Sequence, residues 1–380
     1  MKSTKQSFKN TKSKKIKPKR SKKIKLFDPV IGLDEEKEII KILKSGNWAS
    51  GAGNGKVFEF ENKFCDYVGS KQCVAVNSGT AALNLSLSLL DLKNKEVILP
   101  SLSFVSTAHA VTLNGGIPKF VDIDPKTLCI DPKKIKSSIS KKTIAILPVH
   151  FAGIACNLDH ISKICKENNL YLIEDAAHAA GTKYKSNRIG KHGMAICFSF
   201  HPVKNLAMPT GGLIAINGDK NKKLKKILNE RRWCGITDRI GTNYDVKNVG
   251  WNYYMNELSA GIGLIQLKKL DKNNKLRRKI ALRYFNEINL EQKMPFDNNA
   301  SYHFYWILSK NREKLMNKLA EHGIETGTHY KPIHQMSMYK TKQKLPITES
   351  AGKKIVTLPT HPNLKNFQIK KIINCINEFT

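Results

Sequence analysis

Short apolar runs alternate with polar and small-residue segments over much of the chain. Seven such runs are found, each ending in turn residues: 73–77, 96–100, 119–123, 143–149, 170–173, 195–200 and 212–217. Apolar runs of this length, without strict alternation, are typical of strands that are buried on both faces of a parallel sheet. The helical segments between them favour an α/β large domain built on a seven-stranded sheet.

Helical spacing of apolar residues appears on either side of this region. Residues 33–43 have acids in the first turn, which indicates a helix start, and residues 57–69 form an amphipathic pattern. A basic helix is predicted over 220–233 and a long helix over 256–270. We expect residues 26–260 to form the large domain, and residues 261–380 a smaller one with two or three strands and several helices.

One stretch, residues 170–212, combines two of the runs with polar chemistry. The first run ends at Glu174 and Asp175, and the second delivers Ser199 and Lys204 to a turn rich in Pro and Gly. The carboxyl ends of such strands are where open α/β sheets bind ligands. An acid and a lysine in one crevice suit pyridoxal phosphate (PLP) chemistry, in which lysine holds the cofactor as a Schiff base and the acid pairs with the protonated pyridine nitrogen.

The pattern alone leaves a plainer alternative open. With 65 Lys and Arg in the chain, a lysine near a strand end is common, and Asp175 could simply cap a helix. The turn after residues 73–77 has the same ambiguity. Ser78, Gly79 and Thr80 start a helix, where free N–H groups bind anions such as a cofactor phosphate, but a capping serine without a ligand is also common.

Several motifs carry a resemblance to a known family. EDAAHAAGTKYKSNRIG (174–190) and CFSFHPVKNLAMPTGG (197–212) resemble the DegT-type sugar aminotransferases, and the similarity extends from about Gly32 to the C-terminus. These are fold-type-I PLP enzymes with a seven-stranded large-domain sheet, acting on keto sugars of nucleotide sugars. The resemblance implies that Lys204 is the Schiff-base lysine and Asp175 the partner of the pyridine nitrogen.

The resemblance also implies roles for other residues. His178 stands beside the cofactor phenolic oxygen, Phe104 stacks on the pyridine, and Ser199 joins Ser78, Gly79 and Thr80 at the phosphate. GWNYYM (250–255) is similar to a family segment whose Asn reaches the phosphate of the neighbouring subunit, which implies a homodimer and a contact in trans by Asn252. Tyr254 stands where Arg is frequent, which puts in doubt any substrate contact made by that Arg. His329 and Tyr330 are implied to approach the substrate, although the sequence alone allows a packed strand end.

The family implies transfer of an amino group from an amino acid, here glutamate, to a keto sugar. EDAAH together with SFH-x-x-KN is closest in wording to the UDP-4-amino-4-deoxy-L-arabinose aminotransferases, which points to C4 of a UDP-4-keto sugar. One rival is a PLP-dependent sugar dehydratase of the same family, but those carry His where Lys204 stands. A non-catalytic regulatory or nucleic-acid-binding paralogue would be expected to lack Asp175 or Lys204. His150, which has no evident proton-transfer partner in the sequence, is interpreted as a wall residue.

Charge and cysteine usage complete the picture. The net charge is +34, of which residues 1–25 contribute twelve Lys and Arg and no acid. This basic arm has too few apolar residues to fold alone and lacks the interleaved aromatics of a nucleic-acid surface, so we expect a solvated, disordered tail. The basic body favours anionic ligands such as nucleotide diphosphates.

Eight scattered cysteines without a C-x-x-C pair, and no secretory signal, predict reduced thiols, no metal site and a cytoplasmic location.

Overall fold

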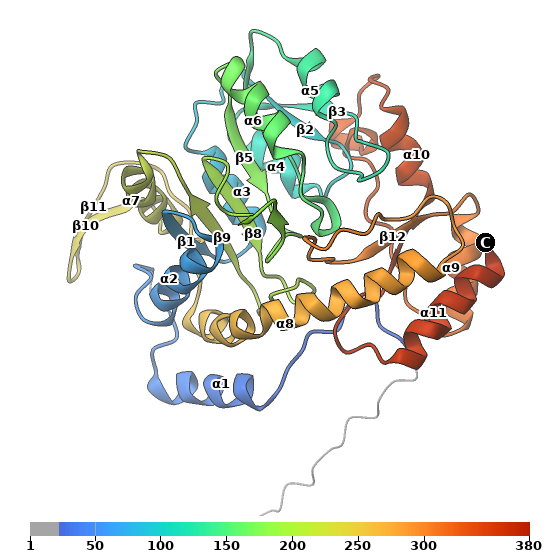
Figure 1. The fold of residues 1–380 in the computed structure, drawn as a ribbon. Coiled ribbons are helices and arrows are strands. Elements are labelled where there is room, and N and C mark those ends of the chain that lie inside the picture. The colour runs from blue at the N-terminus through green and yellow to red at the C-terminus, as the bar shows by residue number, and fades with distance from the viewer. Residues whose placement is uncertain (1–22, 50) are drawn as a thin grey trace, which may run out of the picture.

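A seven-stranded sheet forms the centre of the larger domain (Figure 1). The computed structural model describes residues 23–49 and 51–380. In sheet order the strands are β1 (Gln72–Val76), β9 (Gly212–Ile216), β8 (Ala195–Ser199), β5 (Tyr171–Asp175), β4 (Thr143–Ile146), β2 (Glu96–Pro100) and β3 (Ile117–Val121). The seven predicted strands are confirmed, with β3 beginning and ending two residues earlier than expected.

The strand directions bring the predicted site residues to one edge. β2, β3, β4, β5 and β8 pair in parallel, and β9 runs antiparallel to both β8 and β1. All strands except β9 therefore point the same way. The carboxyl ends of β1, β2, β5 and β8 meet at one side of the sheet, where the segments that follow them can share a cavity.

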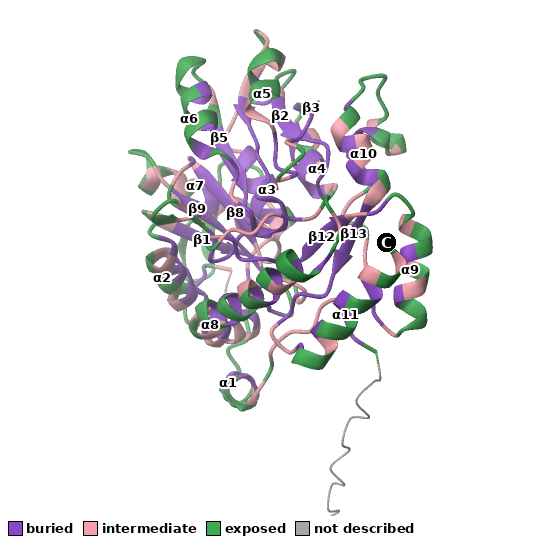
Figure 2. Ribbon diagram, turned by 45° about the vertical axis from the view of Figure 1, so that its right-hand side comes forward, coloured by how far each residue is buried: buried purple, intermediate pink, exposed green. Residues whose placement is uncertain are grey.

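The sheet is buried on both faces, as the uninterrupted apolar runs predict. In β9, Leu213 and Ala215 belong to one hydrophobic cluster, whereas Ile214 and Ile216 belong to the other. The helices α3 (Gly79–Leu87), α4 (Ser106–Leu113) and α7 (Asn221–Arg232) pack on the second side. On the first side lie α2 (Lys56–Val68), α5 (Pro132–Ser138), α6 (Leu158–Glu167) and α8 (Glu257–Glu287). Figure 2 shows the buried strands between the partly exposed helices.

The helix α8 is longer than predicted. The apolar pattern predicts an end near residue 270, but the helix continues to Glu287. The second half lacks a clear apolar stripe because polar side chains occupy buried positions: Asn274 donates to the carbonyl of Ala180 (2.9 Å), and Arg277 donates to backbone carbonyls. Hydropathy did not reveal this half of the helix, because its buried face opens with the polar Asn273, Asn274 and Arg277 before apolar residues return at Ile280. Within the described residues, no helix is long and apolar enough to cross a membrane.

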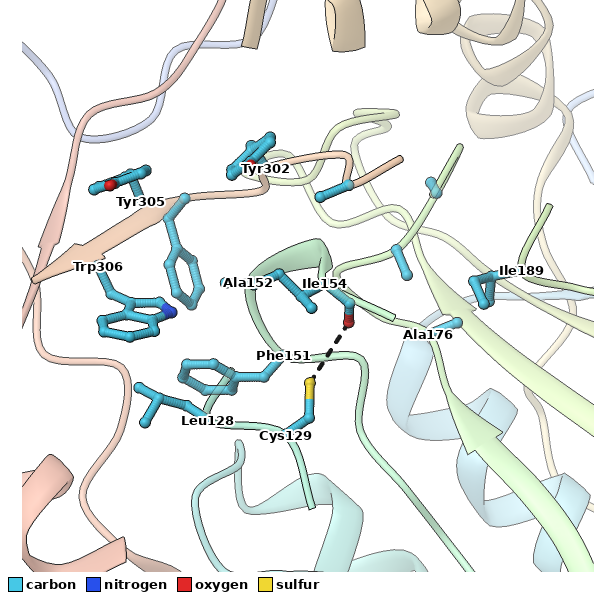
Figure 3. Close-up of a cluster of buried hydrophobic side chains, with 14 of the residues drawn as sticks. Leu128, Cys129, Phe151, Ala152, Ile154, Ala176, Ile189, Tyr302, Tyr305 and Trp306 are labelled. Atoms are coloured by element: carbon cyan, nitrogen blue, oxygen red, sulfur yellow. Dashed lines mark hydrogen bonds between the residues drawn. The ribbon is translucent and has the colours of Figure 1, made fainter. Parts of the chain in front are cut away.

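The C-terminal part packs on the large domain through a shared core. Its two-stranded sheet pairs β12 (Tyr305–Leu308) with β13 (Ile355–Leu358), with α9 (Arg312–Glu321), α10 (Pro346–Lys354) and α11 (Asn366–Phe379) around it. Figure 3 shows Trp306 of β12 near Phe151, which lies just after β4 in the large domain. Outside these parts lie α1 (Leu33–Ser45) and two short hairpins, β6 (Lys183–Tyr184) with β7 (Asn187–Arg188) and β10 (Ile236–Ile240) with β11 (Asn243–Val246). Three short 3₁₀ helices are η1 (Phe151–Gly153), η2 (Ile333–Gln335) and η3 (Ser337–Tyr339).

The predicted basic arm ends earlier than expected. Residues 1–22 lie outside the described part, but Ile24 is already buried. Its backbone N–H donates to the carbonyl of Gly323 (2.7 Å), and its carbonyl accepts from Glu325 N–H (2.9 Å). One apolar side chain among lysines is enough to dock residues 23–25 on the C-terminal part, which the overall charge of the arm conceals.

Candidate active site

A cavity of about 310 Å³ opens at the carboxyl edge of the sheet. Most of the predicted site residues line it together: Ser78, Gly79, Thr80, Phe104, Asp175, His178, Ser199, Lys204, His329 and Tyr330. They come from the ends of β1, β2, β5 and β8 and from a loop of the C-terminal part. The fold therefore gathers residues that are up to 252 positions apart (330 − 78) at one place.

Asp175 is the last residue of β5 and is buried. Its carboxylate accepts hydrogen bonds from Thr107 Oγ1 (2.9 Å) and from the N–H of Ala177 (3.1 Å). Burial raises the pKa of Asp175, while those two hydrogen bonds and the charge of Lys204 oppose the rise. A buried carboxylate held in this way has a fixed direction and lacks a full charge partner, which suits it to pair with a cationic ligand.

Lys204 lies in the turn after β8 and is partly buried. Burial lowers the pKa of its amine to about 8, although the negative charge of Asp175 acts in the opposite direction. A nucleophilic amine must be uncharged, and an ordinary lysine with a pKa near 10.4 is almost wholly protonated at neutral pH. The cavity thus increases the fraction of Lys204 that can attack a carbonyl group.

The N-terminus of α3 forms a cradle in the wall of the cavity. Ser78 caps the helix, its Oγ accepting from Ala81 N–H (3.1 Å), and Thr80 Oγ1 lies 2.7 Å from Ser106 Oγ. Gly79 lies so close to β8 that a Cβ there would come within 2.7 Å of the Ser199 Cβ. Hydroxyl groups and free helix N–H groups are therefore packed side by side, as an anion such as a phosphate requires.

Aromatic and imidazole rings form the remaining wall. His178 Nδ1 accepts from Ala152 N–H (3.3 Å), which leaves Nε2 to donate to the Tyr330 hydroxyl (3.1 Å). Burial keeps the pKa of His178 well below its usual value, so the ring is neutral. Phe104 is 55% exposed and lies 6.0 Å from the Tyr330 ring, which leaves one of its faces free to stack on a flat ligand.

Asn252 lies apart from this cavity. It is exposed and lines an adjoining hollow with Ser78, Thr210 and Tyr254. Its backbone carbonyl accepts from Asn77 Nδ2 (3.3 Å), next to the cradle. Within one chain, then, Asn252 borders the phosphate side of the site without entering it.

The prediction that His150 forms part of the wall is wrong. Its side chain is fully buried beneath the cavity, where Nε2 pairs with Glu174 Oε2 at 2.9 Å and Nδ1 accepts from Cys156 N–H at 3.1 Å. Glu174 also accepts from Gly193 N–H (2.5 Å). Adjacent strand residues point to opposite faces, so Glu174 turns away from the cavity that Asp175 faces, and His150 follows it.

Two side chains that contact Asp175 and Lys204 in the described part of the chain have no counterpart among the sequence-based predictions. Thr107, the last residue of SLSFVST (101–107), is the side-chain donor to Asp175. His303 is the other, and its Nε2 lies 3.4 Å from Lys204 Nζ. The signal for His303 in the sequence is a polar ring opening an apolar strand, YHFYWIL (302–308), which does not show what the ring will face.

The arrangement fits PLP. The cavity volume lies at the lower end of the range for small-ligand sites. A lysine with a lowered pKa, a buried carboxylate, a free aromatic face and an anion cradle are all present in it. Each of these corresponds to one chemical part of the cofactor: the aldehyde, the pyridine nitrogen, the ring face and the phosphate.

Comparison with known proteins agrees with this fit. The model of the DegT/DnrJ/EryC1/StrS aminotransferase family matches residues 29–377. An uncharacterized protein of Methanocaldococcus jannaschii is 33% identical over 374 residues, covering 93% of this chain and 96% of its own length. The GDP-perosamine synthase of Escherichia coli O157:H7 is 35% identical over 353 residues, covering 91% of this chain and 95% of its own length.

Solved structures give the same answer. PseC of Helicobacter pylori, an aminotransferase involved in the biosynthesis of pseudoaminic acid, superposes with a TM-score of 0.88 at 26% identity, covering 94% of this chain and 99% of its own. The PLP form of Spr1654 of Streptococcus pneumoniae, assigned as a sugar aminotransferase, gives 0.88 at 25%, covering 94% and 98%. The fold-type-I architecture, the PLP cofactor and the class of sugar aminotransferase are thereby confirmed. The chain belongs to the DegT/DnrJ/EryC1/StrS aminotransferase family.

Proposed function

We propose that this aminotransferase moves an amino group from glutamate to C4 of a keto sugar linked to a nucleoside diphosphate. The proposal rests on the cavity that Lys204, the buried Asp175 and the anion cradle of Ser78 to Thr80 line together. The net charge of +34 supports an anionic, diphosphate-bearing substrate.

Each side chain has a role in this reaction. PLP, when bound, supplies an electron sink for the carbon that loses a proton. Asp175 would hold a positive charge on the ring nitrogen, Ser78 and Ser199 would hold the phosphate, and Phe104 would cover one ring face. Lys204 takes the proton from Cα of the amino donor in one half-reaction and delivers a proton to the sugar carbon that receives the amino group in the other. That proton transfer, rather than binding alone, is where its position raises the rate.

The sequence and the relatives point to different nucleotides in the substrate. The sequence around Asp175 and Lys204 favours a UDP sugar, whereas a relative at 35% identity is named for a GDP sugar. We would incubate the PLP-loaded protein with ¹⁵N-glutamate and UDP-, GDP- and dTDP-linked 4-keto sugars. Transfer of ¹⁵N to one sugar nucleotide identifies the substrate. If the protein contains bound PLP and transfers ¹⁵N to none of these sugar nucleotides, the proposed class of acceptor is refuted.

The retained lysine and acid also weigh against the rivals. A dehydratase of this family is expected to have His at the position of Lys204, and a non-catalytic paralogue has no reason to keep Lys204 and Asp175 in one cavity. The same incubation distinguishes the first rival, because a dehydratase would release water from the sugar and leave ¹⁵N on the glutamate.

We further propose that the enzyme is a homodimer whose active site is shared. In support, Asn252 borders the cradle from outside the cavity. The nearby hairpin β10–β11 and the loop after it expose large apolar side chains, with Ile240 at 83% and Val249 at 81% exposure. Apolar residues this exposed are suited to burial against a second copy of the chain.

Mixed dimers test the contact in trans. Asn252→Ala and Lys204→Ala each impair their own homodimers. If Asn252 serves the neighbouring site, a heterodimer of the two variants contains one doubly damaged site and one intact site, so activity returns to about half of the wild-type value. A heterodimer of Lys204→Ala with wild type is the assembly control. Activity no higher than that of the Asn252→Ala homodimer would show that Asn252 acts within its own chain.

A further inference from the structure

The side chain of His303 is the only neutral partner that the described residues place in hydrogen-bond contact with the Lys204 amine. It lies just before β12, is 2% exposed, and presents Nε2 to Lys204 Nζ at 3.4 Å. The distance is long for a hydrogen bond, but such contacts are often loose before ligands bind and shorten in the working complex. A ring from the C-terminal part thus touches the reactive group of the large domain.

The imidazole is held by neighbouring rings and at its backbone. The Phe27 ring stacks on it at a centroid distance of 5.2 Å and an interplanar angle of 17°, and the centroid of the His178 ring lies 4.6 Å away. The backbone N–H of His303 donates to Ala152 (2.9 Å), and its carbonyl accepts from the buried Arg277 (3.1 Å). This packing and these backbone hydrogen bonds restrict the orientation of the imidazole, whose Nε2 faces the Lys204 amine.

The ring is neutral. Burial lowers the pKa of His303 well below its usual value, and the nearby positive or protonatable groups Lys204, His178, Arg277 and His329 act in the same direction. Its Nδ1 is buried without a hydrogen-bond partner among the described residues. No neighbour therefore selects the tautomer, and Nε2 can carry either a proton or a lone pair.

We propose that His303 is a positioning residue that holds the free amine of Lys204 in both of its protonation states. This rests on the proposed role of Lys204 in moving a proton. A proton carrier alternates between an ammonium and a neutral amine, and both forms carry N–H bonds. In the tautomer protonated at Nδ1, the neutral imidazole accepts at Nε2 from an N–H of either form without moving a proton itself, whereas the charge of Asp175 favours only the ammonium. His303 keeps the amine at one place through the cycle.

Two substitutions separate hydrogen bonding from packing. His303→Phe keeps a flat ring between Phe27 and His178 but cannot bond the amine. His303→Gln loses the stacked ring but places an amide, with a donor and an acceptor, near the position of Nε2. A positioning role predicts that the glutamine variant stays closer to wild type, while a packing role predicts the reverse order.

The first readout is the chemical reactivity of the lysine, not activity. The full-length protein is loaded with pyridoxamine 5′-phosphate, so that Lys204 has no covalent bond to the cofactor, and is treated with acetic anhydride across a pH series. Acetylation of Lys204 is measured by peptide mass spectrometry relative to the exposed Lys166. In His303→Phe the Lys204 ammonium has no hydrogen-bond acceptor, so the midpoint of the Lys204 titration moves to lower pH. More of the amine is then uncharged near neutral pH, and acetylation of Lys204 is about threefold or more faster than in wild type. In His303→Gln it remains within about twofold of wild type.

The second readout is the amino-donor half-reaction. We expect kcat to fall about ten- to hundredfold in His303→Phe, with KM changed by less than about threefold, since a misplaced group slows the step without weakening binding. The isotope effect from deuterium at the donor Cα should increase in this variant, because proton transfer becomes more rate-limiting. The proposal requires His303→Gln to be closer to wild type than His303→Phe in both readouts. The opposite order, or equal effects, in either readout overturns it. If cofactor trapping places PLP on another lysine, the proposed function of Lys204 fails, whereas the acetylation result still reports on the contact itself.

Discussion

Replacement of Lys204 with arginine is expected to abolish transamination without unfolding the protein. Arginine keeps the positive charge and much of the length of lysine, but its guanidinium remains protonated and cannot form a covalent bond to the cofactor aldehyde. We expect activity below about one ten-thousandth of wild type, since both the anchor and the proton carrier are lost. Sugar-amine formation from ¹⁵N-glutamate measures the loss, and the visible spectrum of added PLP reports the missing covalent bond.

The matched control is Lys166→Arg on α6, an exposed lysine outside the cavity, which should retain full activity. Thermal unfolding of both variants checks the fold. An active Lys204→Arg enzyme would mean that a general positive charge is all that this position supplies, and would remove the basis for the assignment.

Replacement of Asp175 with asparagine is expected to lower kcat/KM by about 10²- to 10³-fold, the usual effect of removing one electrostatic partner of a developing charge. Asparagine keeps the size of the side chain, and its one oxygen can still accept from the Ala177 N–H. Its amide N–H₂ then faces Thr107 Oγ1, which can accept a hydrogen bond in place of donating one. It cannot hold a positive charge on the pyridine nitrogen. The loss should therefore appear in turnover much more than in the cofactor's retention by its phosphate and lysine contacts.

Asp122→Asn is a suitable comparison, because it changes a second buried aspartate at the carboxyl end of a strand of the same sheet. Asp122 accepts from the backbone N–H and the hydroxyl of Thr348 (2.8 and 2.7 Å) and does not line the cavity. This variant should lose about 1–3 kcal/mol of unfolding free energy, typical of a weakened buried hydrogen-bond group, while its folded fraction stays fully active. Equal losses of activity in the two variants would indicate a purely structural role for Asp175.

The strands and the residues at their ends are accessible from the amino-acid sequence. A sheet covered on both faces must use unbroken apolar runs, and the polar residue that ends such a run lies at a common edge. Asp175, Ser199 and the Ser78 turn can therefore be placed together from the pattern of apolar runs alone. The resemblance of the segments around Asp175 and Lys204 to a known family supplies their roles. The structure brings these residues to one cavity, while the roles themselves stay predictions.

Contacts between distant segments cannot be read in the same way. His303 meets Lys204 only because β12 packs beside the cavity, and nothing in the local pattern around residue 303 reports that neighbour. His150 and Glu174 are separated from the site by the strand alternation, which turns adjacent side chains to opposite faces. The second half of α8 and the docking of Ile24 likewise depend on individual hydrogen bonds and one buried side chain, which hydropathy does not register.

Covalent trapping of the cofactor on its lysine identifies the residue that forms the Schiff base. Wild-type protein loaded with PLP is reduced with borohydride, digested, and searched by mass spectrometry for a pyridoxyl group. We expect one labelled site, Lys204, on the peptide that follows AICFSF, and no label after prior conversion to the pyridoxamine form with glutamate. A pyridoxyl group on any other lysine of the native enzyme would contradict the assignment of this cavity as the active site.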